Sequence, residues 1–411
     1  MLLLRRYPVL TVLTTAQALY WSCSIIGITL TGLVGQKLSP WPMLATLPLA
    51  ILVTGCLMAV TPIARWMAKL GARSAMRRGA LLGVAGGLIC TLAIYAASFT
   101  LFCLGILLVG AYQASSGYYR FVALEQVPAE FQGRAAACVV AGGIAAALIA
   151  PSIAVQSQHM LGTPIAGAYV AVAVLACMAW AVLGKLPRVQ RSSVQPSATN
   201  TNAPAAPHPS PVTRRMLWQR PALRHALLLT ACGHGLMILV MNATPLAMHQ
   251  HGHELAASAS VIQWHVLGMF LPSLFAGHAL DRWGAQRTAA LGVAVLFVSA
   301  MVALTGEQHM QYLISSLLLG IGWNFMLLSG TRMLTLAYQP HERSVAQPMM
   351  EWNNNAVAAA MSLGSGVLVQ TLGWQAINLA MLPVLCCMAW WLRPTAHIST
   401  PAHPQNGSDS R

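Results

Sequence analysis

The sequence predicts an all-α polytopic membrane protein of twelve transmembrane helices, arranged as two six-helix halves that repeat each other. Of the 411 residues, 57% are hydrophobic and only 8% are charged, whereas soluble globular chains carry about 25% charged residues. Apolar runs of roughly 18 to 25 residues recur along the chain, and each is long enough to cross a bilayer as a helix.

The predicted spans divide the chain into two halves. The spans are 8–34, 43–64, 79–98, 100–122, 135–156, 165–185, 223–247, 256–279, 288–305, 311–334, 344–370 and 374–392. The predicted units are a first half (1–186), a flexible cytoplasmic linker (187–221), a second half (222–394) and a disordered cytoplasmic tail (395–411). The linker is rich in Pro, Ser, Thr and Asn, and it lacks the apolar residues needed to build a core.

A weak internal repeat supports the two halves. A shift of 212 residues aligns Gly110, Arg120, Pro128 and Glu130 with Gly322, Arg332, Pro340 and Glu342. A shift of 213 aligns "ARWMAKLGAR" (64–73) with "GHALDRWGAQ" (277–286). Duplicated six-span units in parallel orientation follow from this.

The charge of +15 reflects topology rather than a nucleic-acid partner. All 23 Lys and Arg residues except Lys37 fall in or beside the loops of one side. Basic residues near span ends stay in the cytoplasm, so both termini are expected there, in the inner membrane of a bacterium.

Glu351 is the most informative polar residue of the spans, because an intramembrane carboxylate needs a partner, a cavity or a use. On a helix it shares a face with Gln347, Asn354 and Asn355. Two roles stay open: coupling transport to protons, or structural pairing with Arg120 or Arg332.

Other polar and aromatic residues in the spans suggest a planar, hydrogen-bonding solute. The candidates for binding it are Gln17, Trp21, Gln113, Tyr119, His234, Asn242, Gln263, Trp323, Asn324, Asn354 and Asn355. Because no Lys or Arg is predicted near the middle of a span, a largely neutral solute is favoured over an anion.

The motif "GHALDRWGAQR", Gly277 to Arg287, resembles the loop motif of the major facilitator superfamily of secondary transporters. The resemblance implies alternating access, with Asp281, Arg282 and Arg287 bracing helix ends in one state of the cycle. A carboxylate near a helix N-terminus is electrostatically favourable. The first-half copy departs from the motif, with Ala64 and Ala68 where the second half has Gly277 and Asp281.

Two further stretches bear on the branch of the superfamily. "GGIAAALIAPSIA" (142–154) keeps Pro151 of the family's Gly-rich antiporter motif but has Ala at positions 146, 150 and 154, so the antiporter signature is degraded. "GIGWNFMLLSGTRMLTLAYQPHERSVAQPMMEWNNN" (320–355) resembles the branch that includes bacterial riboflavin transporters. The expected function is therefore proton-coupled transport of a small solute such as riboflavin, and multidrug efflux is the alternative.

The sequence contains no catalytic constellation and no Walker-type loop, and no second ligand cluster accompanies the histidines of "HQHGHE" (249–254). We therefore expect no enzyme activity, no metal and no other cofactor. The expected partners are the solute, protons and the bilayer, with a monomer as the functional unit.

Overall fold

The computed structural model describes residues 2–41, 44, 47–157, 160, 163, 165–187 and 212–392, and within them the regular elements are all helices. In chain order they are α1 (Leu2–Arg6), α2 (Pro8–Leu38), α3 (Leu47–Leu70), α4 (Ala72–Tyr95), α5 (Phe99–Ser116), α6 (Tyr119–Glu125), η2 (Ala129–Phe131), α7 (Gln132–Ser157), α8 (Ala166–Leu183), α9 (Arg214–Trp218), α10 (Pro221–Gln250), α11 (Leu255–Phe270), α12 (Ser273–Trp283), α13 (Ala285–Leu304), α14 (His309–Ala337), η3 (Pro340–Glu342) and α15 (Arg343–Trp391).

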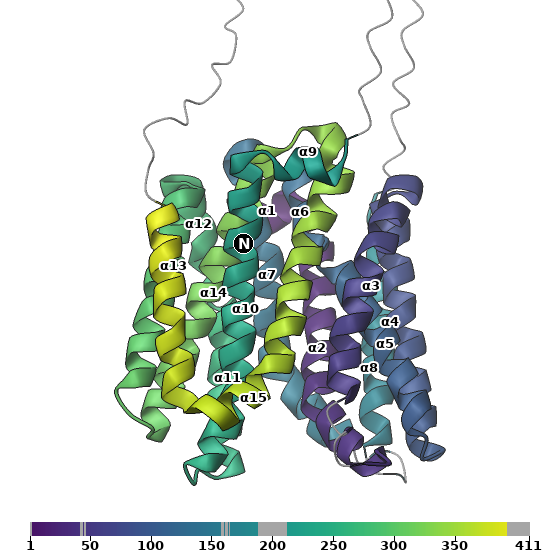
Figure 1. Ribbon diagram of the computed structural model, residues 1–411. Coiled ribbons are helices and arrows are strands. Elements are labelled where there is room, and N and C mark those ends of the chain that lie inside the picture. The colour runs from purple at the N-terminus through teal and green to yellow at the C-terminus, as the bar shows by residue number, and fades with distance from the viewer. Residues whose placement is uncertain are drawn as a thin grey trace, which may run out of the picture.

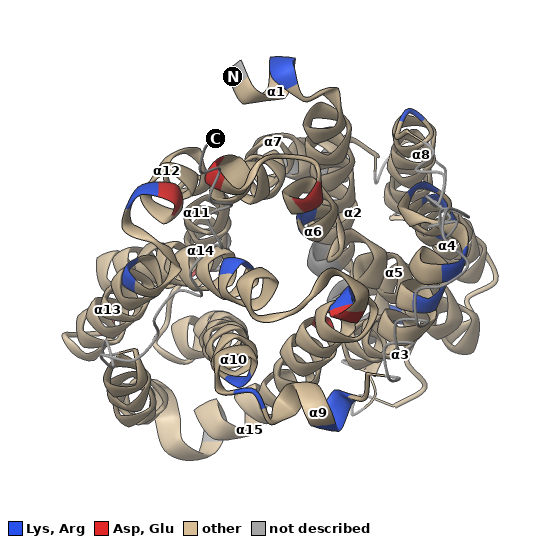
Figure 2. Ribbon diagram, turned by 90° about the horizontal axis from the view of Figure 1, so that it is seen from above, with Lys and Arg blue, Asp and Glu red and all other residues tan. Residues whose placement is uncertain are grey.

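The long helices run side by side in one bundle (Figure 1). The described part of the chain begins and ends at the same end of this bundle, which Figure 2 views from above. We call this end, which carries α1, η2, α9 and η3, the terminal face, and we call the opposite end the far face.

The predicted fold class is confirmed. Eleven segments of the described chain are long and apolar enough to cross a membrane. The segment 344–370, predicted as the eleventh span, is helical but is not among them, because Glu351 and the three asparagines after it lower its hydropathy.

Two breaks within spans, and one between spans, follow from local sequence. Gly117 separates α5 from α6, so the fourth span is two helices. Pro272 separates α11 from α12, because proline has no N–H to donate and its ring clashes with the preceding turn. In α15, Gly373 has the non-helical values φ 79° and ψ 172°, which divide the eleventh predicted span from the twelfth.

The two halves meet along two lines of contact. Helices α2 to α8 pack mainly with one another, and so do α10 to α15. Between the halves, α3 lies against α15, while α7 lies against α11 and α12. These two interfaces enclose the space in which the predicted site residues were expected.

The internal repeat reappears in the backbone. Gly71 and Gly284, which are 213 residues apart, begin α4 and α13 with nearly the same left-handed conformation, φ 81° and 83°. A side chain would strain the backbone at both turns. The short helices η2 and η3 also occupy matching places, each just before the long helix that follows it.

The predicted linker and tail lie mainly outside the described residues. The last part of the predicted linker, from Val212, contains α9, whose first turn is capped by the Thr213 hydroxyl accepting a bond from the Met216 N–H. This short helix packs against α10 and α15 at the terminal face.

Candidate functional site

A cavity of about 90 Å³ lies between the two halves. Its lining comes from both halves: Gln17, Tyr20, Trp21, Cys56, Gln113, Ser116, Gly117, Arg120, Val139, Val140, His234, Phe270, Trp323, Leu327, Glu351, Asn354 and Asn355. Seven of the predicted solute-binding residues line it, together with Glu351: Gln17, Trp21, Gln113, His234, Trp323, Asn354 and Asn355. The sequence pattern therefore brings residues from α2, α5, α10, α14 and α15 to one place.

Glu351 forms an ion pair with Arg120 across the interface between the halves. Both side chains are largely buried, with 7% and 11% of their surface exposed. The Arg120 Nε also donates to the Thr331 hydroxyl at 3.1 Å. Gly117 permits this approach, because a Cβ there would collide with the Glu351 carboxylate.

Arg120 corrects one expectation from the sequence. No cation was predicted near the middle of a span, yet Arg120 lines the cavity. The break of the fourth span at Gly117 leaves Arg120 in the first turn of the short helix α6, inside the bundle. Its charge is matched there by Glu351.

Arg332, the other cation expected near Glu351, contacts different groups. It donates to the carbonyl of Ala129 at 3.1 Å and to the side chain of Gln132. Arg332 lies nearer the terminal end of its helix than Glu351 does, so it contacts the start of α7 in the first half. It thus joins the halves without reaching the cavity.

His234 and Trp323 form a hydrogen-bonded pair on the second-half wall. The indole Nε1–H of Trp323 donates to His234 Nδ1 at 2.9 Å. An indole nitrogen can only donate, so Nδ1 accepts with a lone pair, and a neutral His234 carries its proton on Nε2. The imidazole can therefore offer an N–H as a donor.

Amide oxygens are available at the cavity as acceptors. Gln17 Oε1 and Asn354 Oδ1 are buried and have no hydrogen-bond partner within the described part of the chain. Asn355 differs, because its Oδ1 accepts from the Cys56 thiol (3.0 Å) and its Nδ2 donates to the Glu351 carbonyl (2.8 Å). Buried polar atoms usually have partners, so the two free oxygens indicate a place for a polar ligand or water.

Four predicted solute-binding residues lie outside this cavity. Asn324 donates to the Met269 carbonyl (2.7 Å) and the Ser273 hydroxyl (2.6 Å), and so joins α14 to α11 and α12. Asn242 donates to the Ser362 hydroxyl at 3.0 Å, which joins α10 to α15. Tyr119 is fully buried, and Gln263 is exposed.

Phe270 was missed by the sequence reasoning. Its ring lies 4.8 Å from that of Trp21, edge to face, across the interface between the halves. Nothing distinguishes a cavity phenylalanine from a core one in an apolar span, so only the nearby break at Pro272 could have drawn attention to it.

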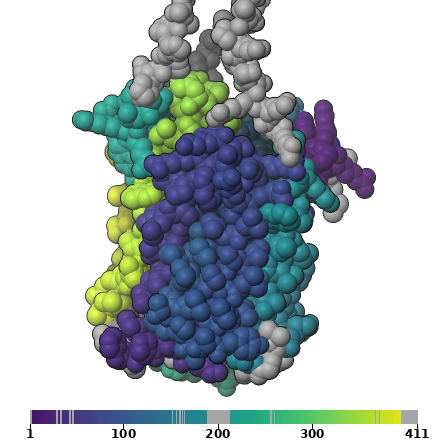
Figure 3. Space-filling view, turned by 90° about the vertical axis from the view of Figure 1, so that its right-hand side faces the viewer, coloured from purple at the N-terminus to yellow at the C-terminus, as the bar shows by residue number. Residues whose placement is uncertain are grey.

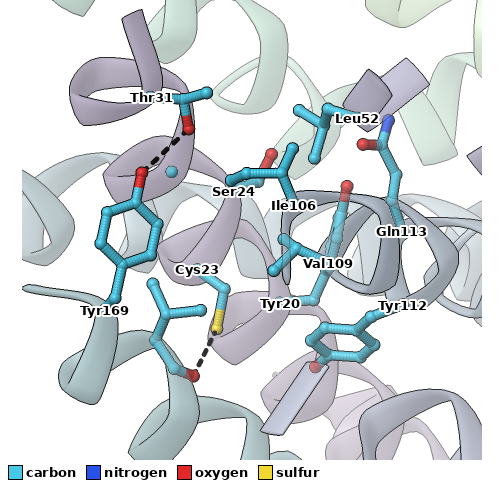
Figure 4. A pocket seen from close by; sticks show the side chains of 12 residues that line it. Tyr20, Cys23, Ser24, Thr31, Leu52, Ile106, Val109, Tyr112, Gln113 and Tyr169 are labelled. Carbon is cyan, nitrogen blue, oxygen red and sulfur yellow. Dashed lines mark hydrogen bonds between the residues drawn. The ribbon is translucent and has the colours of Figure 1, made fainter. Parts of the chain in front are cut away.

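A smaller space lies behind this cavity, inside the first half (Figure 4). It measures about 10 Å³, and Tyr20 and Gln113 border both spaces. The Thr31 and Tyr169 hydroxyls are hydrogen-bonded at 3.0 Å along its edge, and the Cys23 thiol donates to the Val172 carbonyl. A space of this size holds about one water molecule, so it is not a solute site.

The loop motif makes an interface contact on the terminal side of the cavity. Asp281 accepts from the backbone N–H groups of Gly133 (2.9 Å) and Arg134 (3.3 Å) and from Arg134 Nε (2.8 Å). These N–H groups belong to the first turn of α7, whose positive end stabilises a carboxylate. Arg282 and Arg287 are exposed, and neither has an ion pair among the described residues.

Two glycines allow this contact. A Cβ on Gly277 would lie 2.7 Å from the Cα of Arg134, and a Cβ on Gly133 would strike the Asp281 carboxylate. The glycine that begins the motif is therefore explained by close packing of α12 against α7.

Further polar contacts join the halves near the terminal face. Arg343 Nη1 donates to Glu125 at 2.8 Å, and Gln347 Nε2 donates to the other oxygen of Glu125 at 3.2 Å. The hydrogen bonds and ion pairs found between the halves in the described chain lie at the cavity or on its terminal side.

Two of the three histidines of the 249–254 stretch belong to a hydrogen-bonded cluster on the far face. His251 is bonded to the Tyr312 hydroxyl (2.8 Å) and lies 3.4 Å from the Glu307 carboxylate. His253 is bonded to the Glu307 carbonyl. Among the described residues, no group of three His, Cys, Asp or Glu side chains is arranged to hold a metal.

Comparison with known proteins identifies the family. The model of the Major Facilitator Superfamily matches residues 230–408. The riboflavin transporter RfnT of Brucella anthropi is 36% identical over 377 residues, which cover 91% of this chain and 92% of the relative. The methylenomycin A resistance protein of Bacillus subtilis is 32% identical over 165 residues, 38% of this chain and 35% of that protein.

A solved structure agrees. The human organic anion transporter MFSD10 superposes with a TM-score of 0.73 at 13% identity, over 94% of this chain and 99% of that one. The chain belongs to the major facilitator superfamily of membrane transporters.

Proposed function

We propose that the protein is a proton-coupled secondary transporter of a small, largely neutral, planar solute, riboflavin or a similar compound. The observation that carries this proposal is the 36% identity to a riboflavin transporter over nearly the full length of both chains. The domain division at residues 187–221 and the cytoplasmic location of both termini belong to the same proposal, on the basis of the Lys and Arg distribution.

The chemistry of the cavity supports a heteroaromatic solute. The rings of Trp21, Phe270 and Trp323 offer flat apolar surfaces. The free oxygens of Gln17 and Asn354 match the N–H donors of such a ring system, and the His234 N–H matches its carbonyl oxygens. A flavin ring carries both kinds of group.

The size of the cavity supports assigning this structure to one part of the proposed transport cycle. Pockets for drug-sized ligands measure about 300 to 1,000 Å³, and this cavity measures about 90 Å³. Solute binding therefore requires the walls to separate. Because the polar contacts between the halves gather at the cavity and on its terminal side, we infer that this state is closed to the cytoplasm and opens from the far face.

We propose that Glu351 couples this movement to protons. Protonation would remove the charge that holds Arg120 and would weaken the contact between α6 and α15. The structural alternative, in which the pair only stabilises the fold, predicts a different response to mutation of Glu351.

The transport proposal is tested by riboflavin uptake in bacterial cells that lack their own riboflavin transporter. We expect uptake that saturates, is competed by planar analogues, is abolished by a protonophore and falls in the Asn354→Ala variant. The Asn242→Ala variant is the control, because Asn242 lies outside the cavity and is bonded to Ser362. Uptake equal to that of cells carrying an empty vector would refute riboflavin as the solute.

Drug efflux is the second candidate, supported by the partial similarity to the methylenomycin A resistance protein. The same cells distinguish the two functions. An exporter would lower the accumulation of planar drugs and raise resistance to them, whereas an importer would leave resistance unchanged.

A further inference from the structure

A second, larger cavity of about 1110 Å³ opens at the terminal face. It lies between the turn from α3 to α4, helix α6, the end of α8 and the start of α15. Five cations line it: Lys69, Arg73, Arg77, Arg78 and Arg343. Figure 2 shows several basic positions together near the terminal-face end of α4, where the helix begins.

The cavity has far more positive than negative charge. Its lining contains the carboxylate of Glu125, which already accepts from Arg343 and Gln347. The other four cations have no ion pair within the described ranges. Arg77 instead lies 4.1 Å from the centre of the Trp180 ring, and its buried Nε has no hydrogen-bond partner there. Clustered like charges repel, so an anion in this cavity would be bound favourably.

Membrane topology alone does not account for this excess. Topology requires basic residues on the cytoplasmic side, and it does not disfavour acids. In the matching loop of the second half, the acid is present as Asp281 and contacts Arg134. The first half has Ala68 at that position, and it has Arg73 where the second half has Gln286. Over positions 68–78 the first half has four cations and no acid, whereas the matching positions 281–291 have two cations, Arg282 and Arg287, beside Asp281, so an anion would balance the excess.

The cavity also has an apolar edge. Leu81 lines it and is 48% exposed, and Leu88 and Leu92 continue along α4 with 53% and 59% of their surface exposed. These residues are seven and four positions apart, so they share one face of the helix. Figure 3 presents the side of the molecule on which α4 lies. A ligand that fits has an anionic head beside an acyl chain.

We propose that this cavity binds the phosphate headgroup of an anionic phospholipid, with an acyl chain lying along the leucine face of α4. Lys69, Arg73 and Arg77 would contact the phosphate, and the N-terminus of α4 adds its partial positive charge. The site is separate from the cavity between the halves, so it does not depend on which solute is transported.

The test is native mass spectrometry of the purified full chain in detergent, titrated with phosphatidylglycerol or phosphatidylcholine. We expect the wild type to retain phosphatidylglycerol in preference to phosphatidylcholine. The double variant Lys69→Gln with Arg73→Gln should lower that affinity by about tenfold. The control is Arg215→Gln with Arg224→Gln, which removes the same charge from terminal-face residues that do not line the cavity.

The Ala68→Asp variant provides an independent check, because it keeps all the cations and adds a carboxylate among them. It should also weaken retention of phosphatidylglycerol, while size-exclusion elution shows that it remains folded. An equal loss in the control, or no loss in either cavity variant, would overturn the proposal. Displacement of the lipid by inorganic phosphate, with no preference for phosphatidylglycerol, would overturn it in favour of a soluble anion.

Discussion

At the scale of single residues, the contact between Glu351 and Arg120 bears most directly on transport. Both side chains line the cavity, and they come from different halves. A buried ion pair can serve stability or function, because removing one partner leaves an uncompensated charge. The two roles make different predictions for the same substitution.

If Glu351 carries the coupling proton, Glu351→Gln should abolish accumulation of solute against a gradient and leave downhill exchange measurable. Glutamine keeps the shape and can accept from Arg120, but it cannot release a proton. The measurements are pH-driven uptake and counterflow in membrane vesicles, with abundance of the variant protein determined in the same samples.

The control is the double variant Glu351→Gln with Arg120→Gln, which also removes the stranded cation. A purely structural pair predicts low abundance in the single variant, from a loss of about 3 to 5 kcal/mol, and rescue in the double variant. That outcome would contradict proton coupling through Glu351.

The sequence analysis identified the polar residues of this site. Glu351, Asn354 and Asn355 share a face because of their spacing, and the structure places all three at the cavity. Asn324 shows why the approach stops there, since a buried amide that joins three helices looks the same in sequence as one that faces a solute. Phe270 carried no polar signal at all.

At the scale of helices, close packing at the interface depends on glycine. Gly277→Ala should destabilise the protein by about 1 to 3 kcal/mol, because its Cβ would lie 2.7 Å from the Cα of Arg134 and force α12 away from α7. Thermal unfolding of the purified protein in detergent measures this loss.

Gly364→Ala in α15 is the matched control. The nearest atom to its Cβ is Leu368 Cδ1 at 3.8 Å, which is ordinary contact. Alanine there should be neutral or stabilising by up to about 1 kcal/mol, because glycine disfavours a helix interior. Equal losses in both variants would show that the close approach at Gly277 has no special cost.

A second helix-scale contact responds to pH. Arg220, just before α10, donates two hydrogen bonds of 2.6 Å to Glu342 in η3, and this pairing lowers the pKa of Glu342 below its ordinary value. A lowered folded-state pKa means that the unfolded chain binds the proton more readily. The stabilisation is therefore present above the ordinary carboxyl pKa and is lost as the pH falls through the folded-state pKa.

Glu342→Gln should accordingly lower the unfolding temperature at neutral pH. It should have little effect in acid, where the wild-type carboxyl group is protonated and is therefore uncharged, like the glutamine. The difference at neutral pH should correspond to about 1 kcal/mol or less, because the Arg220 side chain is 42% exposed. Unfolding curves of both proteins across the acid range measure it. A difference that does not change with pH would assign the effect to packing instead.

At the scale of the whole molecule, the proposed cycle requires the halves to part at the terminal face. Asp281→Asn with Arg343→Gln weakens two of the contacts that hold them together. In this variant, Cys56 should react faster with a membrane-permeant maleimide, because it lies between α3 and α15 and is 1% exposed in this state. Peptide mass spectrometry reports the reaction at each cysteine.

Cys90 is the control, because it is equally buried but lies within the first half, where its thiol contacts the Phe102 carbonyl. Its reactivity should stay unchanged. If both cysteines react faster, the variant has loosened generally, and the idea of a specific opening between the halves is wrong.

The overall fold was predictable because apolar length and the duplicated loops specify spans and halves. Gly71 and Gly284 mark the same turn in both copies, and the sequence alone aligned them. The contacts across the interface were not predictable. The pairing of Asp281 with Arg134 and of Arg343 with Glu125 depends on how the halves are docked, which span-level patterns do not encode.

The small volume of the cavity has a consequence for the proton gradient of the cell. With its walls close together, the cavity cannot open until the contact between Glu351 and Arg120 parts, and under the proposed coupling a proton and the solute part it together. Protons should then cross only together with solute, and the membrane potential would not be dissipated by idle turnover. A carrier built in this way can be abundant in the membrane without acting as a proton leak.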